Sequence, residues 1–447
     1  MLISNVKKAF NYYKKNGFVE TWYASCERIS QKRIKYNYEA PGSDELNRQS
    51  NHKFENNPLI SIIVPAYETN PLFIEDLVLS VEEQTYTNYE LIIADASETS
   101  HVSRMVRNLK EQYENITYIK LEENKGISEN TNKALEAAGG EYIALLDHDD
   151  LITPDALYEV VNVINKCKKK KVDPVLIYSD EDKTDTYNDI YYDANIKGTF
   201  NNEMIATNNY ICHLSVYRKD VINILRLRSE YDGAQDYDLV LRTLLYCRNI
   251  YKDNWKDYIL HIPKVLYHWR CHEESTAQNP ESKLYAYEAG QRAVENYVRG
   301  LGYDCKVTPL KHLGFYRVEY NGGILRARAD VGAVGGPVFR KNVTIGGIMD
   351  AKGKCPYAGL NIHYSGRMNR AVLMQDAEAV DIRNILIRPT HEQLFKKTTG
   401  LSYPISDKQR ADISDEEFIQ KSLLFCNKLR RLGITILYDP MMRAEDR

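Results

Sequence analysis

The stretch LISIIVPAY, residues 59–67, is an apolar, β-branched run that ends in proline, alanine and tyrosine. A continuous run of this kind is typical of a strand that is buried on both faces, as in a parallel sheet. Outward from it, PLFIEDLVLSVEEQ (71–84) has the periodicity of a helix, and YELIIAD (89–95) is a second buried strand. The stretch therefore opens a β-α-β unit.

The same alternation continues as far as residue 147. Helical periodicity in 103–113 precedes a strand in 116–124. A helix in 126–140, closed by two glycines as expected of a C-cap, precedes the strand EYIALLD (141–147). This alternation predicts an α/β fold with a doubly wound, mostly parallel sheet and right-handed crossovers. Ligands of such sheets bind beyond the carboxyl ends of the strands.

The last of these strands ends in concentrated negative charge, at Asp147, Asp149 and Asp150. Neighbouring carboxylates raise one another's pKa unless a cation or hydrogen-bond donors hold them. Asp150 also suits the N-cap of the helix that follows Pro154, but a cap does not explain the other two. Mg²⁺ and Mn²⁺ prefer oxygen ligands. No GxGxxG or Walker lysine loop follows the first strand, so a dinucleotide site or a P-loop is not supported.

Composition narrows the class of protein. The 447 residues predict two or three domains, and 43% hydrophobic with 27% charged residues is ordinary for a globular protein. A net charge of −3 gives no reason to expect nucleic acid. Eight scattered cysteines without a CxxC pair suggest neither zinc nor disulfides, which fits the cytosol. We expect no signal peptide and no membrane span. The run Lys168–Lys171 is a solvated helix end or a basic spot that faces anionic lipid.

Changes in texture along the chain suggest three regions. Residues 1–57 have helix-like spacing and then become a charged linker, and residues 58–311 hold the β/α alternation. Residues 312–447 follow as a separate region. The N-terminal helix has a narrow apolar face, which favours packing or a partner over a membrane.

Six motifs occur in a fixed order, each at a predicted strand end or loop: ISIIVPAYETN (60–70), SVEEQTYTNYELIIADAS (80–97), ENKGISENTNKALEAAGGEYIALLDHDD (123–150), IYSDEDK (177–183), YDGAQDYDLVLR (231–242) and HIPKVLYHWR (261–270). Together they closely resemble the inverting glycosyltransferases of family 2, which have the GT-A nucleotide-sugar fold. The resemblance covers about residues 58 to 311.

The resemblance implies roles for the residues at matching positions. Asp95 would accept a hydrogen bond from uracil or thymine. Asp147 would lie near the ribose and Asp149 on the divalent metal, Mn²⁺ or Mg²⁺, with His268 as a third metal or diphosphate contact. The remaining expected nucleotide-sugar contacts are Pro65, Ala66, Tyr67, Asn124, Gly126, Asn132 and Arg270.

Inverting transfer needs a base that takes the proton of the attacking acceptor hydroxyl. The family's Glu-Asp pair is Gln235-Asp236 here, so Asp236 is the expected catalytic base, with one charge fewer beside it. Asp238 suits a helix start better. Asp180, Glu181, Gln235 and Trp269 are expected to contact the acceptor or sugar. For the Asp180–Asp182 cluster, a solvated turn is nearly as good an interpretation.

The segments 329–350 and 418–440 resemble the second half of another family 2 module, but no nucleotide-binding strands or Asp-x-Asp accompany them. Where the catalytic Asp pair would fall, the chain has Lys421-Ser422-Leu423-Leu424. We interpret residues 312–447 as a degenerate half-module that packs on the first module or binds acceptor or partner. A folded extension that completes the core is an equally good interpretation.

The resemblance thus implies a metal-dependent, inverting glycosyltransferase that builds a bacterial surface glycan or glycolipid. The donor would be a UDP- or dTDP-linked sugar and the acceptor a glycan or a lipid-linked glycan. We expect a cytoplasmic protein with a peripheral contact at the inner face of the plasma membrane. One alternative is a non-catalytic glycan-assembly scaffold, although the intact Asp147, Asp149, Asp236 and His268 argue against it. A nucleotidyltransferase would need a glycine- and lysine-rich loop where Pro65-Ala66-Tyr67 stands.

Overall fold

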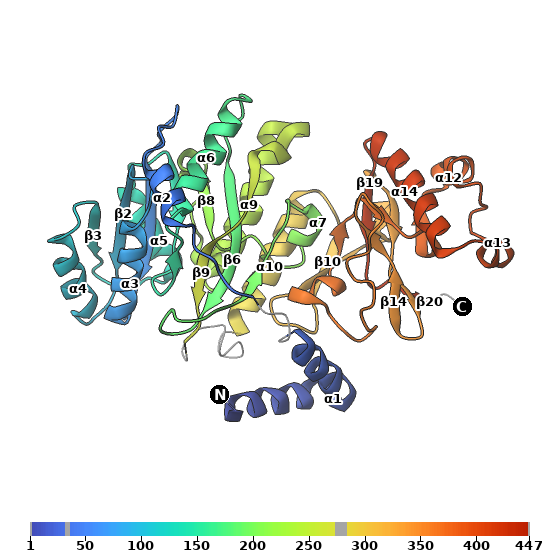
Figure 1. Cartoon of the computed structure of the whole chain (residues 1–447), viewed down its shortest axis with the longest axis horizontal. Coiled ribbons are helices and arrows are strands. Elements are labelled where there is room, and N and C mark those ends of the chain that lie inside the picture. Colours follow the sequence, from blue (N-terminus) through green and yellow to red (C-terminus); the bar gives the residue numbers. More distant parts are fainter. Residues whose placement is uncertain (1, 32–35, 273–283, 446–447) are drawn as a thin grey trace.

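The computed structural model describes residues 2–31, 36–272 and 284–445 (Figure 1). Its centre is a nine-stranded sheet with the order β3-β2-β1-β4-β8-β6-β9-β5, and β7 pairs with β6. The strands are β1 Ile60–Ala66, β2 Tyr89–Asp95, β3 Ile116–Lys120, β4 Tyr142–Leu145, β5 Leu151–Ile152, β6 Leu176–Thr184, β7 Tyr191–Asn195, β8 Ser215–Arg218 and β9 Ile259–Arg270. Neighbours among β3, β2, β1 and β4 are parallel, as are β6 and β9, whereas β8, β7 and β5 run antiparallel to their neighbours.

Helices cover both faces of this sheet because successive strand residues point to opposite sides. Ile63 of β1 packs into the core beneath α5, α8, α9 and α10. Its neighbours Ile62 and Val64 pack into the opposite core, beneath α3, α4 and α6. The helices are α3 Pro71–Glu82, α4 His101–Lys110, α5 Ile127–Ala137, α6 Ala156–Lys168, α7 Asn202–Ile205, α8 Lys219–Leu225, α9 Gln235–Tyr251 and α10 Leu284–Gly300. The doubly wound, mostly parallel α/β sheet expected of a GT-A-type protein is confirmed.

Two local predictions are wrong. The glycines after α5 do not form a left-handed cap, because the helix ends at Ala138 in an extended conformation. Gly140 is needed for close approach instead: a Cβ there would lie 2.7 Å from the Leu59 carbonyl oxygen. Asp150 does not cap α6 either. Asp155 occupies the N-cap position, and Asp150 is buried at 1% exposure under β9.

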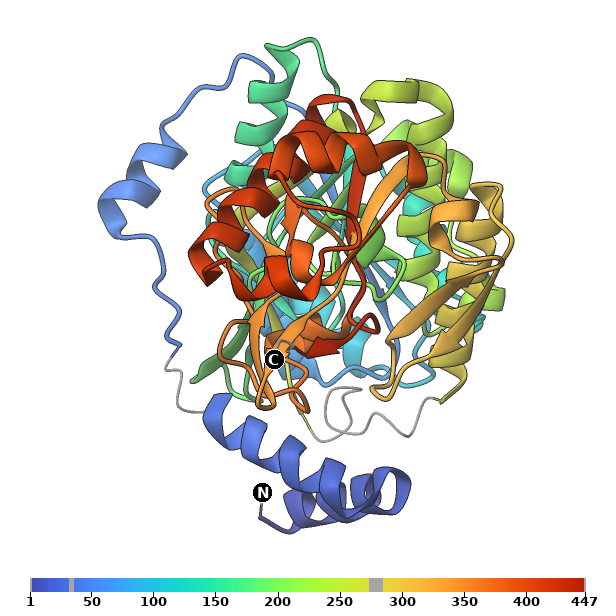
Figure 2. The same cartoon turned by 90° about the vertical axis from the view of Figure 1, so that its right-hand side faces the viewer.

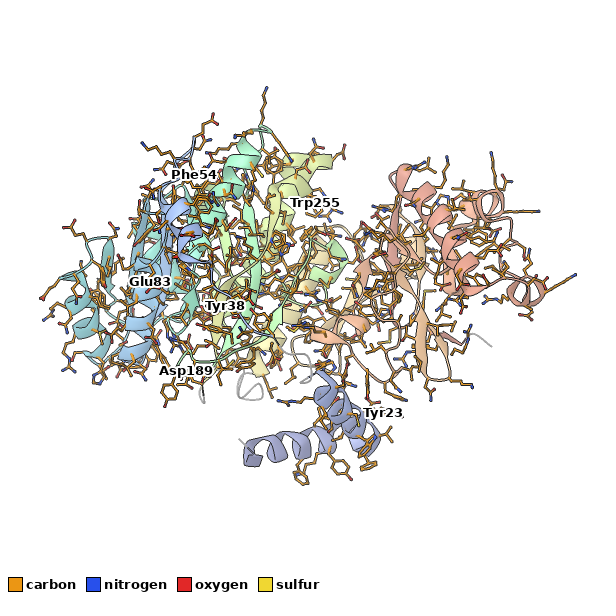
Figure 3. All side chains as sticks on the ribbon, viewed as in Figure 1. Tyr23, Tyr38, Phe54, Glu83, Asp189 and Trp255 are labelled. Atoms are coloured by element: carbon orange, nitrogen blue, oxygen red, sulfur yellow. The ribbon has the colours of Figure 1, made fainter. Side chains whose placement is uncertain are left out.

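The N-terminal region forms α1 (Leu2–Gln31), kinked at Gly17, and α2 (Ser43–Ser50). Figures 1 and 2 show α1 projecting below the body, while the segment from residue 36 onward runs along the sheet. This segment is held by specific contacts. Tyr38, labelled near the middle of Figure 3, packs edge-on against His268. The Asn56 backbone NH donates to the Asn165 side chain at 2.9 Å. The predicted linker is therefore anchored to the sheet domain.

The C-terminal region has its own small sheet, in which β12 and β19 run parallel between antiparallel β18 and β16. Helix α14 packs on this sheet around Phe395, Phe425 and Tyr438. The elements are β10 Cys305–Pro309, β11 Tyr316–Tyr320, α11 Ile324–Ala327, β12 Val331–Gly335, β13 Val338–Arg340, β14 Val343–Gly346, β15 Ile348–Met349, β16 Gln375–Asp376, β17 Ala379–Val380, β18 Ile385–Ile387, α12 Glu392–Thr399, α13 Asp407–Ala411, α14 Asp415–Arg431, β19 Thr435–Tyr438 and β20 Ala444–Glu445. That this region is a degenerate repeat stays a prediction.

Buried polar contacts join the C-terminal region to the sheet domain. Arg328 and Glu203 form an ion pair at 2.7 Å in which both side chains are 5% exposed. The Asp376 carboxylate accepts a hydrogen bond from the Asn202 backbone NH at 2.8 Å. Removing one partner of a buried pair leaves an uncompensated charge, which costs about 3–5 kcal/mol. The two regions are therefore coupled in stability.

In residues 2–31, 36–272 and 284–445 no helix is both long and apolar enough to cross a bilayer.

Candidate active site

The polar residues at the carboxyl ends of the first strands lie next to one another. In the parallel pairing of β1 and β2, Pro65 is opposite Ala94 and Ala66 is opposite Asp95. Tyr67 follows and is 44% exposed. A backbone turn with an exposed ring beside a carboxylate is a surface on which a planar base could stack and hydrogen-bond.

Asp95 is fully buried and already well bonded. Its carboxylate accepts hydrogen bonds from the Tyr118 hydroxyl at 2.6 Å and from the Ser97 backbone NH at 2.8 Å. Lys120 lies 3.7 Å away. A carboxylate has about four acceptor positions, so one more donor can be accommodated after a small opening.

The loop before α5 brings two distant motifs together. Gly126 has a φ of 93°, and a Cβ there would lie 2.2 Å from the Asp232 carboxylate. Asp232 in turn accepts a hydrogen bond from the Ser128 backbone NH, at the start of α5. Asn124 is exposed and accepts from the Gly126 NH at 3.1 Å. The glycine is thus required by the carboxylate that packs on it.

Asn132 was predicted to contact the nucleotide sugar, but its side chain is bonded to the protein backbone. Its side chain is 8% exposed, and both ends of the amide bond the Leu227 backbone, at 2.9 and 3.0 Å. These bonds tie α5 to the segment before α9. Asn132 therefore positions the loop around the candidate base rather than presenting a free amide.

The acidic cluster divides into three different environments. Asp149 bonds His272 at 2.8 Å. Burial alone would raise the pKa of Asp149, but the hydrogen bond from His272 and the charges of His148 and His272 together outweigh it, and the pKa is lowered. Asp150 accepts from the Tyr267 hydroxyl at 2.5 Å and from the Arg270 NH at 2.7 Å. Burial and the charges of Asp149 and Asp147 raise the pKa of Asp150 well above its ordinary value.

Asp147 faces a histidine that sequence reasoning missed. His213 Nε2 lies 3.6 Å from an Asp147 oxygen, and its Nδ1 lies 3.6 Å from Glu181. Burial opposes protonation of this ring, but the Glu181 contact and the charge of Asp147 outweigh it and raise the pKa of His213 to about 9. The ring also stacks on Tyr267 at 4.8 Å. In the sequence, His213 follows Cys212 outside all six motifs, so no pattern marks it.

Asp236 lies in the first turn of α9, close to the same crevice. Its carboxylate accepts a hydrogen bond from the Asn209 amide at 2.9 Å. Its charge contributes to the raised pKa of Asp147, after burial and Asp149. The 209–213 loop therefore touches both, through Asn209 and His213. The Gln235 side chain accepts from the Gly233 NH at 2.8 Å, which fixes the turn before the helix.

Asp238 serves a different purpose. It is 2% exposed and is held by Arg228 and Arg242, the latter at 2.7 Å. Its carboxylate is thus the centre of a two-arginine ion pair, and it does not face the crevice as a base would.

Two predicted ligands from the HIPKVLYHWR motif are enclosed by protein. The His268 ring is bonded to Asp182 at 2.5 Å and packs between Tyr38 and Tyr191. The Arg270 side chain is 1% exposed. Its three guanidinium nitrogens donate to Asp76, the Thr186 carbonyl and the Asp149 carbonyl. Arg270 thus braces the backbone of Asp149, and neither side chain is presented to a diphosphate.

The expected acceptor and sugar residues also differ in their surroundings. Trp269 lies on the same side of β9 as His213, 6.2 Å between ring centroids. Glu181 lies beneath His213 and accepts from its backbone NH at 2.5 Å. Burial alone would raise the pKa of Glu181, but Lys197 and His213 lower it to about 2. Asp180 is 2% exposed and bonds His261 at 2.8 Å, so it belongs to the framework.

A divalent cation fits this chemistry with few protein ligands. In the part of the chain that the structure describes, no cluster of three or more His, Cys, Asp or Glu side chains is arranged to hold a metal. Mg²⁺ is commonly held by one or two carboxylates together with substrate phosphates and water. Asp149, with His272 against it, offers such a partial set at the mouth of the crevice. His272 was not predicted, because it falls just beyond the recognised motif.

Comparisons with known proteins identify the family of this chain. A family model described as "Glycosyl transferase family 2" matches residues 61–225. The uncharacterized protein y4gI of Sinorhizobium fredii is 40% identical over 248 residues, 55% of this chain and 26% of that protein. The putative colanic acid biosynthesis glycosyl transferase WcaA of Escherichia coli is 30% identical over 227 residues, 46% of this chain and 74% of that protein.

Among solved structures, the chain is similar to Staphylococcus aureus TarS 1–349 in complex with UDP, with 19% identity, a TM-score of 0.39, and coverage of 54% of this chain and 65% of that one. The chain spans about a quarter of the length of y4gI. Because the relative from Escherichia coli is matched over most of its length, the chain belongs to glycosyl transferase family 2.

Proposed function

We propose that the chain is a metal-dependent, inverting glycosyltransferase that moves a sugar from a nucleoside diphosphate to a hydroxyl of a growing surface glycan or glycolipid. The observation that carries the proposal is the position of three carboxylates: Asp147 and Asp149 follow β4 at its carboxyl end, and Asp236 lies in the first turn of α9. The 209–213 loop links them, since Asn209 bonds Asp236 and His213 contacts Asp147. The relative's role in colanic acid biosynthesis supports a surface polysaccharide as the product.

The chemistry follows from the positions of the residues. The acceptor oxygen forms a bond to the anomeric carbon as the bond to the diphosphate breaks on the opposite face. Asp236 takes the hydroxyl proton, and Asn209 holds the carboxylate in place. A divalent cation held by Asp149, with His272 beside it, would supply charge stabilisation for the leaving diphosphate. Pro65, Ala66, Tyr67 and Asp95 would hold the base of a UDP- or dTDP-linked donor.

In this scheme the protonated His213 ring helps the site to accept a diphosphate. Glu181 lies beneath the ring and Asp147 in front of it, so a cation is kept at the bottom of the crevice. A fixed positive charge beside Asp147 offsets the repulsion between the acidic side chains and an incoming diphosphate. Gln235 and Trp269 are the remaining candidates for contact with acceptor or sugar.

A thermal-shift screen tests this proposal. A ligand that binds only the folded state adds about 2.7 kcal/mol to the free energy of unfolding at 100 times its Kd. We expect UDP and UDP-sugars to raise the melting temperature with Mn²⁺ and to do so much less with EDTA. A sugar nucleotide that raises it is then assayed for slow hydrolysis. Binding without any hydrolysis or transfer would favour the non-catalytic scaffold, and no shift with any uracil or thymine nucleotide would contradict the proposed donor site.

We further propose that α1 rests on an anionic membrane surface, where a lipid-linked acceptor would be found. Residues 1–35 contain eight basic and two acidic residues, a net charge of +6, whereas the whole chain carries −3. Both acidic side chains face the body: Glu20 pairs with Lys311 at 2.6 Å, and Glu27 accepts from the Gly366 NH at 2.7 Å. Tyr23, labelled in Figure 3, stacks on His363 on the same face.

The opposite face of α1 carries exposed apolar side chains. Phe18 is 69% exposed, Trp22 60% and Ile29 60%, and their spacing places them on one side of the helix. Basic residues near a membrane that contains anionic lipid are worth about 1 kcal/mol each, and aromatic rings suit the interface. The net positive charge of residues 1–35 and the exposed apolar side chains of α1 match such a surface.

Vesicle sedimentation tests this contact. The full chain is expected to pellet with vesicles that contain phosphatidylglycerol and not with pure phosphatidylcholine. The double variant Phe18→Ser/Trp22→Ser should lose binding by about tenfold or more, whereas Ile250→Ser, which removes an exposed apolar residue of α9, should not. Equal pelleting with neutral vesicles would contradict the proposal, as would a concentration-dependent dimer that the same double variant abolishes.

A further inference from the structure

A groove of about 720 Å³ lies where the C-terminal region meets β7 of the sheet domain. Ile196 lines it from the sheet domain, and Tyr357, Met368 and Gln375 line it from the C-terminal region. Its charged lining residues are Arg367 and Arg370, and among the residues that the structure describes no carboxylate lines it. None of the predicted site residues lies in it.

Each of the two arginines is held by a hydrogen bond to an uncharged acceptor. Arg367 donates to the Ala194 carbonyl at 2.6 Å, and Arg370 donates to the Asn195 side chain at 3.0 Å. Among the described residues, neither guanidinium has a carboxylate within ion-pair distance. Burial lowers the pKa of Arg370, although Tyr357, Tyr210 and the charge of Asp180 act in the opposite direction. A half-buried guanidinium normally has a paired anion.

The backbone between the two arginines has an uncommon, left-handed conformation. Met368 has a φ of 53° and Asn369 a φ of 58°, both in the left-handed region that side chains seldom adopt. The Gln375 amide donates to the Arg370 carbonyl at 2.6 Å and to the Tyr357 hydroxyl at 2.8 Å. Strained backbone persists where the surroundings enforce it, and it is concentrated at ligand sites.

A short chain of contacts connects the groove to the crevice. Asn195, which accepts from Arg370, donates to Glu181 at 3.0 Å. Glu181 contacts His213, and His213 contacts Asp147. Three side chains, those of Asn195, Glu181 and His213, therefore lie between Arg370 and Asp147. A groove at this distance from the acidic cluster suits the part of an acceptor beyond its reacting sugar.

We propose that this groove binds an acidic group of the acceptor glycan, a carboxylate or a phosphate, through the paired guanidinium groups of Arg367 and Arg370. Forked guanidinium groups match the two oxygens of such anions, and the apolar and aromatic lining suits a sugar ring. The inference rests on the proposed function, because it assigns the groove to that reaction's acceptor. It gives the C-terminal region a role in choosing acceptors that carry negative charge.

Ligand-observed NMR on the full chain, with UDP and Mn²⁺ present, tests the groove. The probes are methyl β-glucuronide, its neutral counterpart methyl β-glucoside, and methyl β-glucoside 6-phosphate. Hydrogen bonds to charged groups are worth about 1.5–3 kcal/mol, so an acidic probe should bind at least about tenfold tighter than the neutral one. Comparison of the two acidic probes identifies whether carboxylate or phosphate is preferred.

Arg367→Gln/Arg370→Gln should remove this preference and leave UDP binding unchanged, and Arg370→Lys, which keeps the charge but loses the fork, should weaken it in part. Arg431→Gln, on the exposed face of α14, is the matched control. Equal binding of acidic and neutral probes, or an unaffected double variant, would overturn the inference. Because UDP is monitored in the same sample, failed donor binding with intact acidic preference would contradict the proposed function alone.

Discussion

Asp149→Ala is expected to abolish Mn²⁺-dependent binding of UDP and to lower sugar transfer by at least about 10²-fold. A cation that neutralises a leaving diphosphate contributes several kcal/mol to the transition state, and each 1.4 kcal/mol is a factor of ten in rate. Asp149 is the carboxylate of the cluster with a lowered pKa and an imidazole beside it, so it offers an ionised oxygen to a cation. Calorimetric titration of UDP with and without Mn²⁺ measures the loss directly.

The fold should survive this substitution. Removing Asp149 relieves the repulsion that raises the pKa of Asp150 and Asp147, and it also removes the contact with His272. These two effects oppose each other, so the melting temperature without ligand should change little. Asp189→Ala, an exposed aspartate labelled in Figure 3, is the matched control. Unchanged Mn²⁺-dependent affinity for UDP in Asp149→Ala would remove Asp149 from the metal site.

The sequence predicted the sheet because its signal is local. Apolar strands such as 60–66 and 89–95 are buried on both faces, and parallel strands place their carboxyl ends at one edge, so Asp95 and Asp147 had to be near one another. The strand-end argument does not reach Asp236, which was predicted only from the family resemblance. Asp236 lies on a helix, and the position of that helix depends on tertiary packing.

The remaining site residues depended on contacts that no local pattern records. His213 and Asn209 come from a loop without a motif, and they acquire meaning only when folding places them against Asp147 and Asp236. His268 is the converse case, because its motif is clear but its ring is not available to a ligand. Two tyrosines enclose it, one of them from the N-terminal linker. A motif therefore located the strand correctly, whereas the surroundings of each side chain decided its role.

The arginine pair in the groove illustrates the same limit. Arg367 and Arg370 lie in a 3-10 helix that follows Gly366, and no motif in the sequence marks them. Their proximity to Asn195 crosses two regions of the chain, so only the three-dimensional structure brings them together with β7.

Asp236→Asn is expected to lower the transfer rate by about 10²–10⁴-fold while donor and metal affinity stay nearly unchanged, because the substitution keeps the shape and removes only the proton acceptor. The Asn209 amide would then face an amide in place of a carboxylate, a minor change in a half-exposed turn. Transfer under single-turnover conditions, with UDP affinity measured in parallel, separates the chemical step from binding.

The neighbouring carboxylate gives the contrasting result. Asp238→Asn leaves Arg228 and Arg242 around a neutral amide, so its main expected effect is a lower melting temperature, with the transfer rate per folded molecule largely kept. Asp253→Asn, an exposed aspartate after α9, should change neither quantity. A near-normal rate in Asp236→Asn beside an inactive but folded Asp238→Asn would place the base two residues later in the helix. The two-arginine ion pair around Asp238 argues against that outcome, because Arg228 and Arg242 already occupy both oxygens of this carboxylate.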